Sequence, residues 1–255
     1  MIIESFQNDK VKYVSRLLAD NRFRKKEGVF AVEGKQENSR ARQFGFDCLE
    51  TVISEKIFNE TLPAGKIINV SDAVYSKLAY RGTSEGIIGI YKTKRSNLQD
   101  FVPSGSSSVI AVESIEKPGN LGAVLRSCEA FGIDALIVTD PKVDFYNPNV
   151  IRSSVGCLFG MNLFYADNEE LYSFLLDKEY EICPTIMHQD AKNIQDRDLR
   201  KNTALIFGTE HSGLSDFWVG KGKNTIVPMV GSIDSLNLSN AVAICAFEIL
   251  RQKMK

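Results

Sequence analysis

Apolar residues along the chain follow two spacings, one typical of helices and one of buried strands. Residues 9–20 carry apolar side chains at Val11, Val14, Leu17 and Leu18, which is the spacing of a helix with one buried face. Short continuous apolar runs between glycines or polar residues are typical of strands covered on both faces. We predict strands at 29–34, 48–54, 86–92, 107–114, 135–140, 179–186, 204–208 and 225–229. We predict helices at 9–20, 35–44, 71–80, 120–132, 169–178 and 236–251.

The alternation of these strands and helices predicts an α/β fold, with a covered parallel sheet in the C-terminal part. Residues 92–108, KTKRSNLQDFVPSGSSS, have no apolar period and predict a linker. We therefore expect two domains, a small α/β domain over residues 1–99 and a larger one over residues 105–255. Ligands of such sheets bind at the carboxyl ends of the strands.

Composition excludes several classes of protein. The chain has 255 residues, of which 44% are hydrophobic and 25% charged, as in a globular protein with a sizeable core. No apolar run approaches the roughly 20 residues that span a bilayer, and the N-terminus lacks the pattern of a secretory signal. The scattered cysteines indicate reduced thiols in the cytoplasm. With no CxxC or HxxxH pair, we expect no metal site.

Charge is divided unevenly along the chain. Residues 1–99 hold 17 Lys and Arg against 12 Asp and Glu, whereas residues 100–255 hold 14 against 20. A basic N-terminal part favours contact with a polyanion, and the alternative is a chance distribution of charge. The basic cluster Arg22, Arg24, Lys25 and Lys26 is our candidate for contact with the backbone of such a polyanion, with a solvated loop as the alternative.

The first of three clusters that could support catalysis is EKPGNLGAVLRSCEAFG (116–132). Asn120 is a good N-cap for the predicted helix. Side chains on a helix lean toward its N-terminus, so Arg126 is expected to project over Gly122 toward the Asn120 loop. The alternative is an exposed arginine on an amphipathic helix.

The second cluster is ALIFGTEHSGLS (204–215), in which an apolar strand runs directly into a glycine-containing loop. Its glycines permit positive φ and leave backbone N–H groups open to a ligand. Glu210 could hold a hydroxyl or an amine. The alternative is a strand-to-helix turn capped by Ser212. No GxGxxG or GxxxxGK[ST] motif is present, which argues against a dinucleotide site and a P-loop.

The third cluster is GSIDSLNLSNAVA (231–243), where small polar side chains precede an apolar helix. Ser235 is expected to cap this helix. Capping does not explain Asn237, Ser239 and Asn240 together, and polar groups at a buried helix start need partners. A polar ligand is one candidate partner, and another segment of protein is the other.

In this order, the three clusters closely resemble the motifs of the SpoU (TrmH) branch of the SPOUT methyltransferases. IRSSVGCLF (151–159) resembles a fourth, shorter family segment, and the resemblance covers roughly residues 105–252. The segments RKKEGVFAVEG and SEGIIGIYK resemble the small substrate-binding domain, related in fold to a ribosomal protein, that precedes the catalytic domain in many members.

The resemblance implies a fold and an activity. The C-terminal domain would contain a trefoil knot that binds S-adenosylmethionine through loops around Gly208, Val227 and Leu236. The reaction would move a methyl group to a ribose 2′-hydroxyl of RNA, with large-subunit ribosomal RNA preferred over transfer RNA. Family members are homodimers. The alternative is a non-catalytic RNA- or ribosome-binding protein on the same fold. The residues carried over as catalytic are Asn120, Arg126, Glu210, Ser235 and Asn237.

The family's proposed role for Arg126 is in deprotonating the 2′-hydroxyl. Arginine stays protonated in proteins, so direct proton abstraction by its guanidinium is chemically awkward. We therefore interpret Arg126 as a clamp on the phosphate beside the target ribose, with Glu210 or water accepting the proton.

Overall fold

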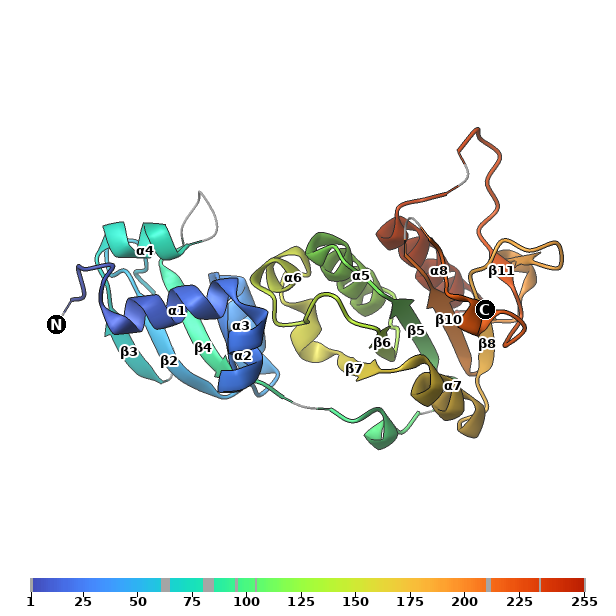
Figure 1. Ribbon diagram of the computed structural model, residues 1–255, viewed down its shortest axis with the longest axis horizontal. Coiled ribbons are helices and arrows are strands. Elements are labelled where there is room, and N and C mark those ends of the chain that lie inside the picture. Colours follow the sequence, from blue (N-terminus) through green and yellow to red (C-terminus); the bar gives the residue numbers. More distant parts are fainter. Residues whose placement is uncertain are drawn as a thin grey trace. The chain divides into compact units, whose positions relative to one another are not determined.

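The computed structural model divides the chain into two compact units. Unit 1 comprises Met1–Arg95 and Asp144–Phe159, and unit 2 comprises Ser96–Val143 and Gly160–Lys255 (Figure 1). The residues described are 2–60, 65–79, 85–94, 96–103, 105–209, 212–233 and 235–254. Among these residues, no helix is both long and apolar enough to cross a bilayer.

Unit 1 contains a four-stranded mixed sheet in the order β1-β4-β2-β3. β2 and β3 are parallel, and β4 runs antiparallel to both β1 and β2. The strands are β1 (Val29–Glu33), β2 (Cys48–Ile53), β3 (Lys66–Asn69) and β4 (Ile87–Lys92). The helices are α1 (Asp9–Ala19), α2 (Asn21–Glu27), α3 (Lys35–Gln43), α4 (Asp72–Leu78) and α6 (Pro148–Ser153).

Most elements of unit 1 lie where the apolar pattern predicts them. The predicted face of α1 is buried at Val11, Val14 and Leu17, and Ser71 caps α4 by accepting a hydrogen bond from the Val74 backbone. Three elements were not predicted: α2, whose sequence we interpreted only as a basic cluster, β3 and α6. Each is seven residues or shorter, too short to show a clear period.

The segment 144–159, which follows strand β6 of unit 2 in the chain, packs into unit 1 through aromatic side chains. Tyr146 stacks on Phe30 with ring centroids 4.1 Å apart, and Phe159 meets Phe46 edge-on at 5.0 Å. Burial raises the pKa of Tyr146 to about 12, and its hydroxyl donates to the Lys94 carbonyl. Unit 1 is therefore completed by residues far along the chain.

A buried ion pair fixes the start of this segment. The Arg24 guanidinium lies 2.6 Å from the Asp144 carboxylate, and the two side chains are only 3% and 9% exposed. Arg24 also donates to the Leu17 carbonyl at 2.8 Å. Our prediction that Arg24 contacts the RNA backbone is therefore corrected, because α2 turns this side chain inward.

Unit 2 contains a five-stranded parallel sheet in the order β7-β6-β5-β10-β8. Its strands are β5 (Ser108–Glu113), β6 (Ala135–Thr139), β7 (Asn162–Ala166), β8 (Glu181–Pro184) and β10 (Thr203–Phe207). A small parallel pair joins β9 (Lys192–Asn193) and β11 (Thr225–Ile226). The long helices are α5 (Pro118–Ala130), α7 (Asn168–Asp177) and α8 (Leu238–Lys253), and short 3-10 turns include η1 (Leu98–Asp100), η3 (Ile194–Asp196) and η4 (Asp216–Trp218).

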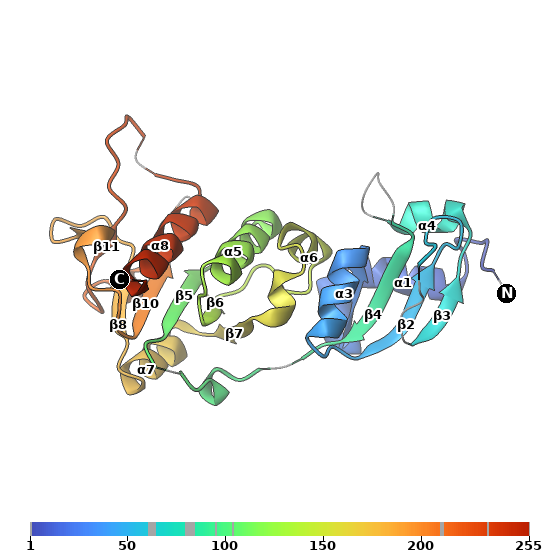
Figure 2. The same ribbon diagram turned by 180° about the vertical axis from the view of Figure 1, so that it is seen from behind.

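The sheet of unit 2 is covered on both faces, as its continuous apolar strands predict. Every residue of β5, β6 and β10 is buried. α5 and α8 lie over one face of the sheet and α7 over the other (Figure 1 and Figure 2). β7 was not predicted, and β11 is shorter than predicted. The trefoil knot implied by the resemblance stays a prediction.

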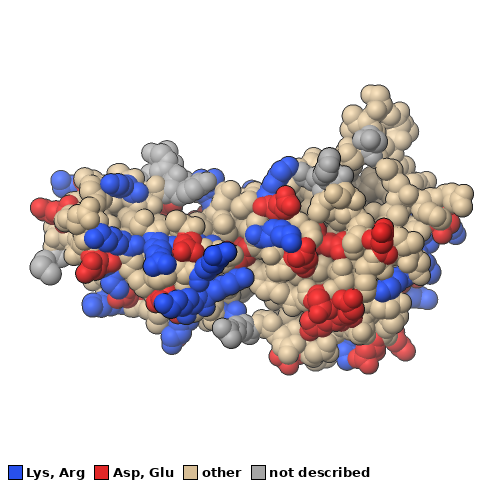
Figure 3. Space-filling view, in the orientation of Figure 1, with Lys and Arg blue, Asp and Glu red and all other residues tan. Residues whose placement is uncertain are grey.

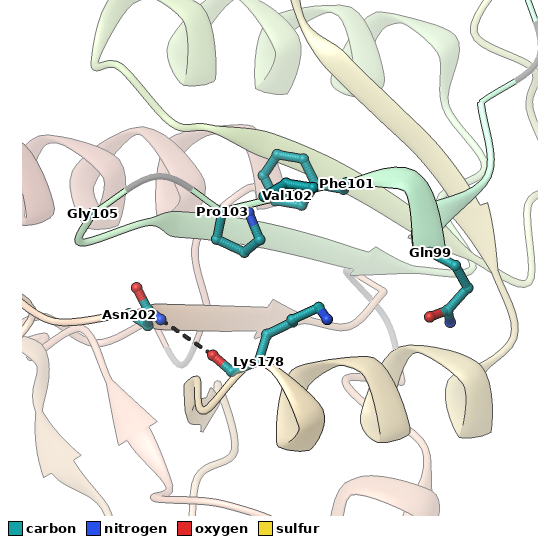
Figure 4. A pocket seen from close by; sticks show the side chains of 7 residues that line it. All are labelled: Gln99, Phe101, Val102, Pro103, Gly105, Lys178 and Asn202. Atoms are coloured by element: carbon teal, nitrogen blue, oxygen red, sulfur yellow. Dashed lines mark hydrogen bonds between the residues drawn. The ribbon is translucent and has the colours of Figure 1, made fainter.

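The predicted linker is partly structured. Lys92 still belongs to β4, and Leu98 and Phe101 are buried in the core of unit 2, where Phe101 lies 5.6 Å from Phe164. A pocket of about 300 Å³ forms beside this segment, at the amino ends of β5 and β10 (Figure 4). It is lined by Gln99, Phe101, Val102, Pro103, Gly105, Lys178 and Asn202.

We predict that Asp144→Asn lowers the free energy of unfolding by about 3–5 kcal/mol, because it leaves the buried Arg24 charge without its partner. The surface pair between Lys92 and Asp47 provides the matched control, since both side chains are more than half exposed. Asp47→Asn should cost no more than about 1 kcal/mol. Urea unfolding measures the free energy of unfolding of the two variants, and equal values would contradict the prediction.

Candidate active site

The first motif forms the start of α5. The helix begins at Pro118, with Lys117 as its N-cap, because proline favours the first helical position. Asn120 was predicted to be the cap and instead lies within the first turn. Its side-chain oxygen accepts a long hydrogen bond, 3.4 Å, from the amide of Asn237.

The third motif forms the start of α8, and here the cap is Asn237 instead of the predicted Ser235. The Asn237 side-chain oxygen accepts from the Ser239 backbone N–H at 3.0 Å and from the Ser239 hydroxyl at 2.6 Å. Capping therefore explains Asn237 and Ser239 together, contrary to our expectation. Ser235 and Asn240 are both exposed on either side of this cap.

α5 and α8 run parallel and side by side. The amides of Asn120 and Asn237 meet at their amino ends, and the rings of Phe131 and Phe247 meet 5.7 Å apart near the far end of α5. Gly122 is buried on α5. The two helix amino ends, each carrying a partial positive charge, therefore lie close together.

A pocket of about 380 Å³ opens beside these helix starts. It lies at the carboxyl ends of β5 and β10, which are neighbouring strands paired in register at Val112 and Phe207. All three motifs contribute to its wall, as the resemblance implies. The described lining residues are Ser114, Ile115, Glu116, Lys117, Asn120, Thr209, Ser212 and Leu238.

One wall of the pocket has an unusual backbone. Ser114 has a φ of 52°, in the left-handed region that residues other than glycine rarely adopt. Its hydroxyl donates to the Asp140 carboxylate at 2.7 Å. The Lys142 ammonium, and next the Ser114 hydroxyl, lower the pKa of Asp140 below its ordinary value. The start of the loop after β5 is thus tied to the end of β6.

The second motif forms a tight loop after β10. Thr209 and Gly213 exchange two backbone hydrogen bonds, at 3.0 and 3.1 Å, and the Thr209 hydroxyl accepts from the Ser212 N–H at 2.9 Å. A Cβ at Gly208 would collide with the backbone of Gly213 and Leu214. The Gly213 N–H is therefore used inside the loop, and Gly208 serves close packing of the loop. Glu210 and His211 lie outside the described residues.

Glu113 lies beneath this loop, and our sequence analysis missed it. It is the last residue of β5 and is 5% exposed. Its carboxylate accepts hydrogen bonds from the Ser215 backbone N–H, the Ser215 hydroxyl and the Asn168 amide. The available signal was a charged residue at the end of an otherwise apolar strand.

The other predicted residues that the structure describes are not part of the pocket wall. Arg126 is exposed on α5, about 9 Å along the helix axis from Asn120. Val227 and Leu236 are half-buried at the two ends of a loop that stands away from the rest of unit 2 (Figure 1). Within that loop Ile233 is 62% exposed. Val227 is not among the described residues of the pocket wall.

Basic side chains gather over α1 and α2 of unit 1, and acidic side chains gather around α7 of unit 2 (Figure 3). Of the predicted RNA contacts, Arg22, Lys25 and Lys26 are exposed. This distribution matches the charge asymmetry along the sequence.

Comparison with known proteins identifies both units. Residues 107–247 match the SpoU rRNA Methylase family, and residues 8–89 match the MRM3-like substrate binding domain. A tRNA (guanosine(18)-2'-O)-methyltransferase of Thermus thermophilus is 32% identical over 148 residues, covering 57% of this chain and 75% of that protein. The 23S rRNA (guanosine(2553)-2'-O)-methyltransferase RlmP of Bacillus subtilis is 24% identical over 250 residues, covering 97% of this chain and 98% of that protein.

A solved structure shares the whole architecture. A crystal structure described as an RNA 2'-O ribose methyltransferase aligns with a TM-score of 0.88 and 32% identity, covering all of both chains. The family match spans more than half of this chain and includes the three motifs that meet at the pocket. The chain belongs to the SpoU rRNA methylase family.

Proposed function

We propose that this protein transfers a methyl group from S-adenosylmethionine to a ribose 2′-hydroxyl of RNA. The observation that carries the proposal is the meeting of the Asn120 and Asn237 amides beside a pocket whose wall is built from all three motifs. Side-chain amides at two helix starts can hold a sugar hydroxyl, because an amide N–H donates to a hydroxyl oxygen and an amide oxygen accepts from a hydroxyl proton.

We infer that the substrate is large-subunit ribosomal RNA. The RlmP relative matches both units, whereas the match to the tRNA enzyme covers only 57% of this chain. The N-terminal match to a substrate-binding domain supports a role for residues 1–99 in holding RNA, with residues 105–255 carrying out the transfer. We place the reaction in the cytoplasm, where the five cysteine thiols, four of them buried, stay reduced.

The residues around the pocket fit the methyl donor. A volume of about 380 Å³ lies in the range of small-molecule sites. Hydroxyls of Ser114, Thr209 and Ser212 can bind the polar groups of a nucleoside, and the Glu116 carboxylate has the charge that attracts a cation. When bound, the donor supplies an electrophilic methyl group on a positively charged sulfur. We propose that Gly208, Val227 and Leu236 contribute backbone contacts to it.

We assign the orientation of the ribose to Asn237 and Ser235, and Asn120 supports the Asn237 amide by accepting its hydrogen bond. We assign Arg126 to the phosphate beside the target sugar, where its guanidinium would fix the angle of attack. The 2′-hydroxyl must lose its proton as the new bond forms. We assign that proton to Glu210 or to water.

The test is transfer of labelled methyl groups to ribosomal RNA by the wild type and by variants of Arg126. Arg126→Ala should lower kcat/KM by about 10²-fold, since lost orientation alone can cost that much. Arg126→Lys should keep part of the turnover, and Arg200→Ala, an exposed arginine elsewhere in unit 2, should keep all of it. Arg126 is not a phosphate clamp if both Arg126 variants lose all turnover at unchanged RNA affinity. A wild type that neither binds the donor nor modifies RNA rejects the function.

We propose that Arg22, Lys25 and Lys26 contact the RNA backbone. Replacing all three by Ala should weaken RNA binding and flatten the plot of log K against log salt by about 2, the value for three phosphate contacts on single-stranded RNA. Filter binding across a salt series measures the slope. The matched control replaces the exposed Arg200, Lys201 and Lys223 of unit 2. A slope equal to the wild type's excludes the three residues as phosphate contacts.

We also propose a homodimer formed through α8. Ile244 and Phe247 are 43% and 51% exposed and lie one turn apart on the same face of this helix, so they form an adjoining apolar pair that a partner surface could cover. Replacing both by Asp should raise the dimer dissociation constant about 30-fold, as for an interface residue worth about 2 kcal/mol. Sedimentation velocity measures it, with Leu176→Asp on the exposed side of α7 as the control. A wild type that sediments as a monomer refutes the dimer.

A further inference from the structure

Glu113 is a buried carboxylate surrounded by neutral donors. One oxygen accepts from the Ser215 hydroxyl at 2.7 Å and from the Asn168 amide at 2.5 Å, and the other accepts from the Ser215 backbone N–H at 2.8 Å. Among the described residues, no lysine or arginine forms an ion pair with it. Within the described part of the chain, the two carboxylate oxygens are therefore satisfied by hydrogen bonds from neutral groups.

A carboxylate at this position is costly. Burying an ionised group requires compensation that an apolar side chain does not need, and the preceding residues of β5 are apolar from Val109 to Val112. Packing alone would be served by another apolar residue. We therefore explain the carboxylate by the hydrogen bonds that it accepts, which an apolar side chain could not form.

The three hydrogen bonds reach in two directions from the end of β5. Two of them hold the backbone and the side chain of Ser215, at the end of the second-motif loop. The third holds Asn168, the first residue of α7. The carboxylate therefore holds both the end of the second-motif loop and the start of α7.

Besides the two backbone hydrogen bonds between Thr209 and Gly213, the second-motif loop is held at two further points. At its start, the close contact of Gly208 with Gly213 and Leu214 allows no side chain. At its end, Ser215 is bound twice by Glu113. Thr209 and Ser212, which line the pocket, lie between these two points. A shift of Ser215 would therefore move the pocket wall.

We propose that Glu113 is a positioning residue for the methyl transfer, acting through Ser215 to hold Thr209 and Ser212 against the pocket. This inference rests on the proposed function. The two partners of the carboxylate then have different effects. Loss of the Ser215 hydroxyl lowers turnover, whereas loss of the Asn168 amide lowers only the stability of the fold.

The test compares Ser215→Ala with Asn168→Ala, since each removes one side-chain hydrogen bond to the same carboxylate. Ser215→Ala should lower kcat about 10-fold, and Glu113→Gln should lower it by up to about 10²-fold, as for displaced reacting groups. Asn168→Ala should keep kcat within about 2-fold while lowering the melting temperature as much as Ser215→Ala does. RNA affinity should be unchanged in all three. Glu169→Gln, an exposed carboxylate in the first turn of α7, is the neutral control.

A double variant separates positioning from general damage. If Glu113 acts through Ser215, Glu113→Gln combined with Ser215→Ala should lose no more kcat than Glu113→Gln alone. The proposal is wrong if Asn168→Ala loses as much kcat as Ser215→Ala. It is equally wrong if Glu113→Gln keeps the kcat of the wild type.

Amide hydrogen exchange provides a readout independent of turnover. Exchange of the Ser212, Gly213 and Leu214 amides should accelerate about 10-fold or more in Ser215→Ala and stay at the wild-type rate in Asn168→Ala. Should the wild type transfer no methyl group, the proposed function fails while this comparison still decides whether Glu113 holds the loop. Equal exchange in the two variants overturns the inference even if the enzyme is active.

Discussion

The parallel pairing of β5 with β10 determines the rest of unit 2. These strands are about ninety residues apart in sequence, yet their registered pairing brings their carboxyl ends to one edge of the sheet. Backbone hydrogen bonding of the ladder thereby places the loop after β5 beside the loop after β10. The polar residues of two motifs meet there, and the Glu113 carboxylate at the end of β5 binds Ser215 of the second motif directly. α8 then adds the third motif by packing along α5, so that Asn237 reaches Asn120.

Elements with long apolar runs could be predicted from the sequence because burial on both faces leaves a local signal. The exact helix starts could not. Ser235 and Asn237 are both good cap residues, and the packing of α8 on α5 decides between them. For α5 the sequence did contain the answer, since Pro118 marks the first helical position better than Asn120 marks the cap. The short β3 and α6 have too few residues to show a period.

Properties that depend on distant partners were beyond prediction. Arg24 resembles its exposed neighbours in sequence, and only Asp144, 120 residues away, shows that it is buried. Glu113 ends an apolar strand as a surface residue would, and its donors come from Ser215 and Asn168. The two sites also solve charge burial differently. Arg24 is paired with an opposite charge, whereas Glu113 accepts hydrogen bonds from neutral donors in the second-motif loop and at the start of α7.

The segment 144–159 has a consequence for how the protein can be divided. The chain passes between the two units three times, because this segment leaves unit 2 after β6 and returns to form β7. A fragment cut after residue 99 would lack Tyr146 and Phe159, so Phe30 would lose two of the rings it packs against and keep Phe46 and Tyr91. The same truncation would remove Asp144 and leave the buried Arg24 guanidinium without its carboxylate partner. Residues 1–99 and 100–255 therefore do not form two independently folding bodies. Recombination between relatives would have to exchange the segment 144–159 together with the rest of unit 1.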